Sequence, residues 1–249
     1  MHDELASPVV PYNRFMRYLS RSPFEKAEAF WKDQLQGNVP RSYPALPSPA
    51  YLPRPNVKMQ AFVPMDMNNA KIGGWDMPLS VMLRAAWAVV MATYSGSDDV
   101  IFASTLSGRS APVAGISDIT GPTMTTVPIR ITIDRQGSVL DFLRAVNEQV
   151  TRMIAFEQTG LQDIRRLVGK ADDALGLGLT TNFLVQPAEA ESQESALMVS
   201  ERDDAATLDF EAYLLILECC VESTGVTLKV QYDDNVVNVK RVESNRQSQ

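Results

Sequence analysis

The side chains that could contribute to chemistry lie in one stretch in the middle of the 249-residue chain, which is rich in Gly, Ser, Thr and Pro. A Ser-Gly-Arg sequence follows one apolar run, and a Gly-Pro pair precedes the next. An arginine directly after a strand can orient a substrate carboxylate, or it can hold a long loop against the core through an ion pair. A Gly-Pro pair most simply makes a turn that lets the backbone pass close to another segment. The candidates for a functional loop are Ser107, Gly108, Arg109, Gly121 and Thr125.

Histidine and cysteine, which often transfer protons or bind metals, are scarce in this chain. Its single histidine, His2, lies at the chain end, before any confident element. A general base must lie within hydrogen-bonding reach of its proton, so we interpret His2 as a solvent-exposed terminal residue. The adjacent Cys219 and Cys220 offer neither a disulfide framework nor metal-ligand spacing. The sequence also shows no Ser-His-Asp triad or phosphate-binding loop, and we expect no catalytic residue and no metal.

The composition is that of an ordinary globular protein. Hydrophobic residues make up 45% and charged residues 21%, which is enough to bury a core, and the formal net charge is −7. This charge, without a basic stripe interleaved with aromatics, argues against nucleic-acid binding. The longest apolar stretch, 79–94, is shorter than the ~20 residues that cross a bilayer, and residues 1–4 lack the basic-then-apolar order typical of a signal peptide. We therefore expect a cytoplasmic protein that contacts neither nucleic acid nor membrane.

Apolar spacing and end signals predict four helices. The first opens at Ser22, with a stripe formed by Phe24, Ala27, Trp31 and Leu35, and ends before Gly37. The second, 79–94, is apolar on nearly every face, which predicts burial on several sides. The third follows the capping residue Ser138, and the fourth covers about 161–168.

Strands are predicted near 59–65, 100–105, 127–133, 177–185, 208–221 and 226–232. The apolar 100–105 strand should lie inside a sheet. Because proline has no backbone N–H to donate, Pro128 indicates that 127–133 is an edge strand or that the proline belongs to the first residue pair of that strand. Six prolines make 40–55 a stiff connector, and we expect 187–206 to be mobile. The alternation of helices and strands indicates an α/β or α+β layered fold.

Several segments, taken in order, resemble the C-terminal half of condensation domains from nonribosomal peptide synthetases. The resemblance covers roughly residues 12–237, and two positions depart from it: Thr125 stands where the family commonly has Asn, and Ala155 where it has Pro. The closing helix also looks cut short near residue 240, which suggests a fragment or a truncated product. The segments that carry the resemblance are 29–37, 79–88, 107–130, 153–158 and 182–183.

The resemblance implies an α/β fold, a chloramphenicol-acetyltransferase-like two-layer sandwich, mainly the second lobe of a condensation domain. In that interpretation residues 1–60 are a linker and capping-helix region that follows a missing N-terminal lobe. Residues 61–239 are the C-terminal condensation lobe, and residues 240–249 are a frayed tail. The 107–125 loop would be the floor of a substrate tunnel that crosses to the absent lobe.

The resemblance also implies a function. The family joins a donor acyl thioester to an acceptor amine, both held on the phosphopantetheine arms of carrier domains. Its paired-histidine motif, HHxxxDG, is absent from this sequence, so the chain should have little or no condensation activity alone. The expected partners are peptidyl or aminoacyl carrier domains, and also a separate N-terminal lobe. We expect no directly bound cofactor besides the carrier's phosphopantetheine arm.

Three interpretations stay open: a partial condensation catalyst, a non-catalytic module that docks a carrier or completes a separate lobe, and a truncated product without a role. For the charged side chains, a structural role is favoured over contact with a substrate. Arg109 should hold the loop, Arg130 should be a buried or half-buried salt-bridge partner, and Glu157 could pair with an arginine of that network.

Overall fold

The computed structural model of the protein describes residues 10–21, 24–37, 40, 42–66, 77–168, 177–187 and 213–237. His2, the capping residue Ser22, residues 188–206 and the 240–249 tail lie outside these ranges, so the expectations placed on them stay predictions.

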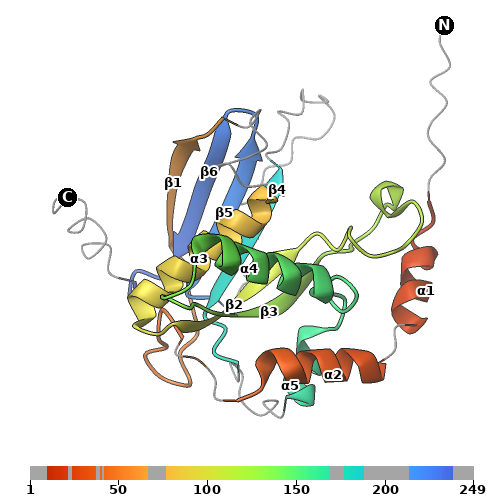
Figure 1. Ribbon diagram of the computed structural model, residues 1–249, viewed down its shortest axis with the longest axis horizontal. Helices are drawn as coiled ribbons and strands as arrows, with labels where there is room; N and C mark the ends of the chain where they lie inside the picture. Colours follow the sequence, from red (N-terminus) through yellow and green to blue (C-terminus); the bar gives the residue numbers. More distant parts are fainter. Residues whose placement is uncertain are drawn as a thin grey trace, which may run out of the picture.

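One mixed sheet of six strands forms the centre of the molecule (Figure 1). Its order is β1-β6-β5-β4-β2-β3, and the β2–β4 and β4–β5 pairs are parallel while the other pairs are antiparallel. As predicted, the 100–105 strand lies inside the sheet and the Pro128 strand lies at its edge. The strands are β1 (Val57–Pro64), β2 (Asp99–Leu106), β3 (Thr125–Thr132), β4 (Thr181–Pro187), β5 (Leu215–Glu222) and β6 (Gly225–Tyr232).

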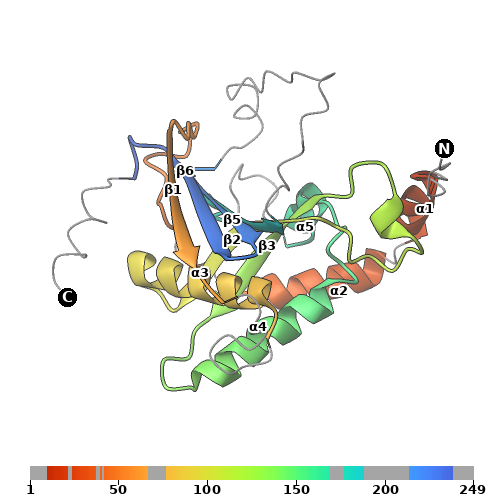
Figure 2. The same ribbon diagram turned by 90° about the horizontal axis from the view of Figure 1, so that it is seen from above.

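Helices α3 and α4 cover one face of the sheet, and α2 lies alongside α4 (Figure 2). The Ser138 side chain accepts a hydrogen bond from the Asp141 amide and starts α4, as predicted. A short 3₁₀ turn, Ile116–Asp118, interrupts the loop between β2 and β3. The helices are α1 (Asn13–Arg21), α2 (Phe24–Leu35), α3 (Leu79–Ser95), α4 (Val139–Met153) and α5 (Leu161–Leu167).

The main core fills the space between the sheet and these helices. Side chains alternate between the two faces of a strand, so every second residue of the central strands points at the helices. Phe102 of β2 and Phe183 of β4 are fully buried there and meet edge to face, with ring centroids 6.0 Å apart. Trp31 of α2 belongs to the same core, so the sheet and α2 share one hydrophobic core.

Three details differ from the sequence-based expectations. Phe24, expected in the buried stripe of α2, is 57% exposed, because the helix begins at this residue and its buried side lies further along. Helix α3 is buried on one side only, and Val89 and Val90 are exposed on the other. Helix α1 was not predicted: it is only nine residues long, and it is supported by tertiary contacts.

Strand β1 spans the boundary suggested between residues 60 and 61. All eight of its residues pair with β6, from Val57 opposite Tyr232 to Pro64 opposite Gly225. The proposed division between a linker region and a lobe therefore does not coincide with a break in the sheet.

Candidate functional site: the loop between β2 and β3

The candidate loop, residues 107–124, leaves and re-enters the sheet at one point. Leu106, the last residue of β2, lies opposite Thr125, the first residue of β3. The intervening segment extends away from the sheet toward α1 (Figure 1). Loops of this length in compact domains are usually functional.

Arg109 holds the far part of this loop together. Its Nη1 atom donates to the carbonyl oxygens of Ile116 at 2.5 Å and Ile119 at 2.8 Å. The sequence suggested a structural ion pair, and the partners found are backbone carbonyls. Two carbonyls of a turn thus receive a charged donor, and the Ile116 carbonyl also accepts from the Ile119 amide at 3.3 Å.

A small second core, which we call the α1 core, fixes the loop from the N-terminal side. It contains Phe15 of α1 with Ala111, Ile116 and Ile119 of the loop. The Tyr12 hydroxyl donates to the Pro122 carbonyl at 2.8 Å. A Cβ atom on Gly121 would lie only 2.4 Å from the Tyr12 ring, so the Gly-Pro turn does bring the backbone close to a distant segment.

The base of the loop is closed by hydrogen bonds between its two ends. The Thr123 hydroxyl donates to the Ser107 carbonyl at 2.7 Å, and the Ser107 hydroxyl accepts from the Arg109 amide at 3.3 Å. Gly108 has a φ of +66°, and a Cβ atom there would lie 1.8 Å from the Thr123 carbonyl oxygen. A side chain at position 108 is therefore excluded by both backbone conformation and space.

The connection between α4 and α5 supports the loop where it enters β3. The Thr125 hydroxyl donates to the Glu157 carbonyl at 2.9 Å. The Gln158 side-chain amide donates to the Thr123 carbonyl at 3.1 Å. The consecutive residues Glu157 and Gln158 of this connection thus hold Thr125 and Thr123, at the end of the loop.

A polar cluster beside the loop was not singled out from the sequence. The hydroxyls of Thr105 and Thr126 lie 3.0 Å apart, and the side-chain amide of Asn182 donates to Thr105 at 3.0 Å. Asn182 is 2% exposed and joins strand β4 to the strands that carry the loop. The resemblance marked Asn182 and Phe183 as a family segment, but it gave no partner for either.

Arg130 lies on β3, away from the loop. It contacts both carboxylate oxygens of Asp99, with Nη2 to Oδ2 at 2.6 Å and Nε to Oδ1 at 2.9 Å, and Nη1 donates to the Gln36 carbonyl at 2.5 Å. The hydrogen bonds that the Arg130 guanidinium donates to Asp99 raise its pKa. The Gln149 side chain donates to the Arg130 carbonyl at 2.6 Å. The arginine thereby connects α2, α4, β2 and β3.

Glu157 lies in the connection after α4 and is 4% exposed. Burial raises the pKa of its carboxyl to about 7, against the opposing effect of the Arg84 charge. Arg84, on α3, is 5% exposed, and burial lowers the pKa of its guanidinium to about 10 while Glu157 opposes that shift. Arg84 was not singled out from the sequence, although a single charged residue in an otherwise apolar helix is the signal that could have marked it.

Within the described ranges, no three His, Cys, Asp or Glu side chains are grouped to hold a metal ion. None of the described helices is both long and apolar enough to cross a membrane. Burial raises the pKa of the Cys219 thiol to about 12, which leaves it unreactive near neutral pH.

The sequence comparisons identify a family. The condensation domain model matches residues 3–242. The chain is 40% identical over 237 residues to the nonribosomal peptide synthetase ecdA of Aspergillus rugulosus, an alignment that covers 94% of this chain and 3% of that protein. It is 42% identical over 233 residues to the nonribosomal peptide synthetase gloA of Glarea lozoyensis, covering 92% and 3%. The chain therefore spans a small part of these relatives.

The structural comparisons identify the fold. The first condensation domain of the calcium-dependent antibiotic synthetase superposes with a TM-score of 0.64 at 14% identity, covering 93% of this chain and 50% of that one. The starter condensation domain of rhizomide synthetase RzmA superposes with a TM-score of 0.66 at 12% identity, covering 95% and 51%. These matches confirm the predicted α/β, chloramphenicol-acetyltransferase-like fold. Together with the family match, they show that this chain belongs to the condensation domain family and corresponds to the C-terminal part of that fold.

Proposed function

We propose that this chain forms one side of the channel in which a condensation domain joins a carrier-bound acyl thioester to a carrier-bound amine. The observation that carries the proposal is the β2–β3 loop, which is held by hydrogen bonds within itself, by α1 and by the connection between α4 and α5. A hydrogen bond from Thr123 to Ser107 closes the base of the loop, and Arg109 binds the Ile116 carbonyl within it. Thr125, where the loop enters β3, donates to the Glu157 carbonyl. Such aminolysis requires two tethered substrates to be held in a fixed geometry, which a firmly held loop favours.

The proton-transfer part of the reaction is assigned to a second lobe. Aminolysis needs a group that accepts the amine proton or stabilises the tetrahedral oxyanion. The chain contains one histidine, at position 2, and no paired-histidine motif. We therefore expect an N-terminal lobe that carries this motif to complete the site, with Ser107, Gly108, Arg109, Gly121 and Thr125 forming the floor. The phosphopantetheine arms of carrier domains would enter between the two lobes.

A reconstitution assay tests this proposal. The chain is incubated with donor and acceptor carrier thioesters, first alone and then with a separately produced N-terminal condensation lobe that contains the paired histidines. The expected result is no amide product from the chain alone and product with both lobes. A partner lobe whose second histidine is replaced by alanine serves as the control. Product formed by the chain alone at the rate of an intact domain would disprove the division of roles.

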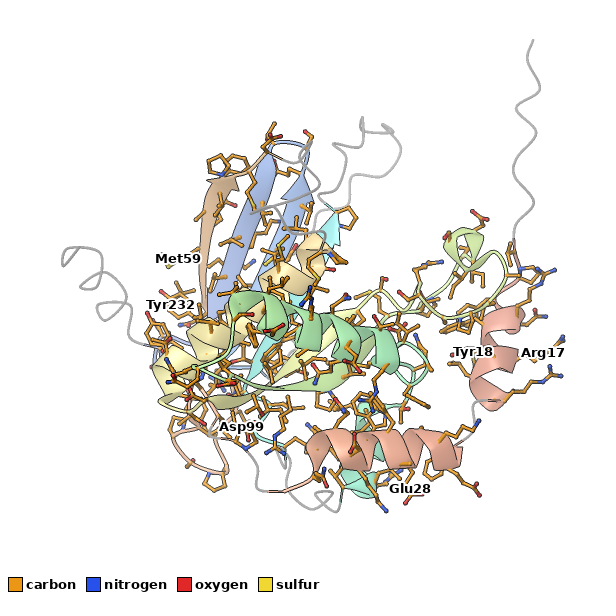
Figure 3. The ribbon with its side chains drawn as sticks, in the orientation of Figure 1. Arg17, Tyr18, Glu28, Met59, Asp99 and Tyr232 are labelled. Carbon is orange, nitrogen blue, oxygen red and sulfur yellow. The ribbon has the colours of Figure 1, made fainter. Side chains whose placement is uncertain are left out.

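A second candidate function is docking without catalysis, either of a carrier domain or of a lobe. It is favoured by exposed apolar residues on the edge strand β1, where Met59, labelled in Figure 3, and Phe62 are each 50% exposed. Binding of a carrier domain to the isolated chain, measured by calorimetry, together with failure of the reconstitution, would favour this function over the first.

A further inference from the structure

Helix α1 presents three arginines on its exposed side. Arg14 lies three residues before Arg17 and Arg21 lies four residues after it, and all three are exposed. Residues at these spacings are neighbours on a helix surface, so Arg17 has an arginine on either side. Figure 3 shows Arg17 on the outer side of α1, with Tyr18 on the side that faces the rest of the molecule. We call Arg14, Arg17 and Arg21 the arginine row.

The arginine row has no acidic partner among the described residues. Helices α2, α4 and α5, in contrast, each pair an exposed basic side chain with a carboxylate of the same helix. These pairs are Glu28–Lys32, Asp141–Arg144 and Asp163–Arg166. Like charges at neighbouring positions destabilise a helix, so the row is an unfavourable pattern for α1 by itself. An anion bound along the row would relieve this repulsion.

The helix that carries the arginine row also holds the far part of the β2–β3 loop. On the buried side of α1, Phe15 packs with Ile116 and Ile119 in the α1 core. Tyr12, directly before the helix, donates to the Pro122 carbonyl at 2.8 Å. An anion on the row would therefore lie beside the outer end of the loop that is proposed as the channel floor.

The substrates of the proposed function bring a suitable anion. A phosphopantetheine arm is joined to its carrier domain through a phosphodiester, while the thioester at the other end of the arm is uncharged. Arginine binds phosphate through a planar fork of donors, and such charge-assisted hydrogen bonds are among the strong ones in proteins. A long polyanion such as a nucleic acid fits less well, because the formal net charge of the chain is −7.

We propose that the arginine row binds the phosphate of the phosphopantetheine arm of a carrier domain, beside the outer end of the β2–β3 loop. The identity of this anion rests on the proposed function, whereas the positive surface is a property of α1 alone. The row holds the phosphate while the thioester end of the arm reaches into the channel. The arginines thus bind the carried substrate and take no part in the bond-forming step.

Binding of one carrier domain in its apo and holo forms tests the proposal. Only the holo form carries the arm, so the ratio of the two Kd values reports what the arm contributes. Calorimetry is done at low salt, where exposed charges are least screened. The wild type should bind the holo form roughly tenfold more tightly, because charge-assisted hydrogen bonds to the phosphate are gained. Arg17→Gln should lose most of this preference. The matched control is Arg144→Gln on α4, which should keep it.

Two further variant measurements separate loss of the site from damage to the helix. Arg17→Lys keeps the charge but not the planar fork, so it should retain part of the preference for the holo form. The thermal midpoint of Arg17→Gln should equal or exceed that of the wild type, because glutamine is a good helix former and a like-charge neighbour is removed. Equal affinity of the wild type for both carrier forms would overturn the proposal. Equal loss of apo and holo binding in Arg17→Gln would also overturn it, since the row would then contact the body of the carrier.

Two small molecules test the site without a docked carrier or a second lobe. Phosphopantetheine and pantetheine differ only by the phosphate group. Phosphopantetheine should shift the amide resonances of residues 14–21, and pantetheine should not. Equal shifts with both molecules, or none with phosphopantetheine, would count against the arginine row. If these shifts are seen while the reconstitution with an N-terminal lobe gives no product, the proposed function fails and the phosphate site remains.

Discussion

The main core and the α1 core support the molecule in different ways. The main core lies under α3 and α4, and its strands are tied to one another by continuous ladders. The α1 core has four buried residues, Phe15, Ala111, Ile116 and Ile119, and holds the candidate loop rather than the sheet. Stability depends on apolar area removed from water, so the first region should set global stability and the second the order of the loop.

The largest effect is expected from Phe102→Ala in the main core. The ring is fully buried against Phe183, and its removal should cost about 3–5 kcal/mol through lost burial and the remaining cavity. Denaturant unfolding measures this loss. The matched control is Phe62→Ala on β1, where half of the side chain is exposed, and its change should stay within about 0.5 kcal/mol. Equal losses in the two variants would contradict the assigned main core.

The next effect concerns pH. The folded-state pKa of Glu157 is about 7, above the ordinary value of 4.5, so between these values the folded state holds a proton that the unfolded state has released. Stability should therefore fall as the pH rises from about 5 to 7, and this fall should vanish in Glu157→Gln. Denaturant midpoints over this pH range provide the measurement. Glu148→Gln, at an exposed position on α4, is the control and should keep the wild-type slope.

A smaller effect, confined to the loop base, is expected from Gly108→Ala. A methyl group there would meet the Thr123 carbonyl oxygen, and the positive φ adds strain, so a loss of about 1–3 kcal/mol is expected. Gly37→Ala is the control, since Gly37 also has a positive φ, +87°, but no atom lies within 4 Å of its Cβ position. Thermal unfolding of the two variants separates the clash from the backbone strain, and equal losses would exclude the clash.

The smallest effect is expected from Tyr12→Phe in the α1 core. The variant removes the hydrogen bond to the Pro122 carbonyl, which contributes about 1 kcal/mol or less, and should reduce amide protection in the loop without changing the global midpoint. The control is Tyr51→Phe, which removes a tyrosine hydrogen bond to Asp233 outside the α1 core. This variant should leave loop protection unchanged. Loss of protection in both variants would show that the loop is not fixed by α1 in particular.

Much of the secondary structure could be predicted from local patterns, and the site only in part. Ser138 indicated the start of α4, and Pro128 indicated an edge strand, because each acts through its own backbone neighbours. The loop itself was found from its length and its glycines. Of its supports, Arg109 was expected, but its carbonyl partners and the contacts of α1 with the loop were not, because these contacts join segments far apart in the sequence.

The amino-acid sequence by itself determined the membership of this chain in the condensation family, the order of most helices and strands, and the position of the candidate loop. Only the tertiary structure decided that Tyr12 lies against Gly121 and that Arg84 and Glu157 are both buried. The physical reason is distance along the chain: periodicity and capping act over a few residues. Burial and hydrogen bonding between segments about a hundred positions apart arise only when the sheet has brought them together.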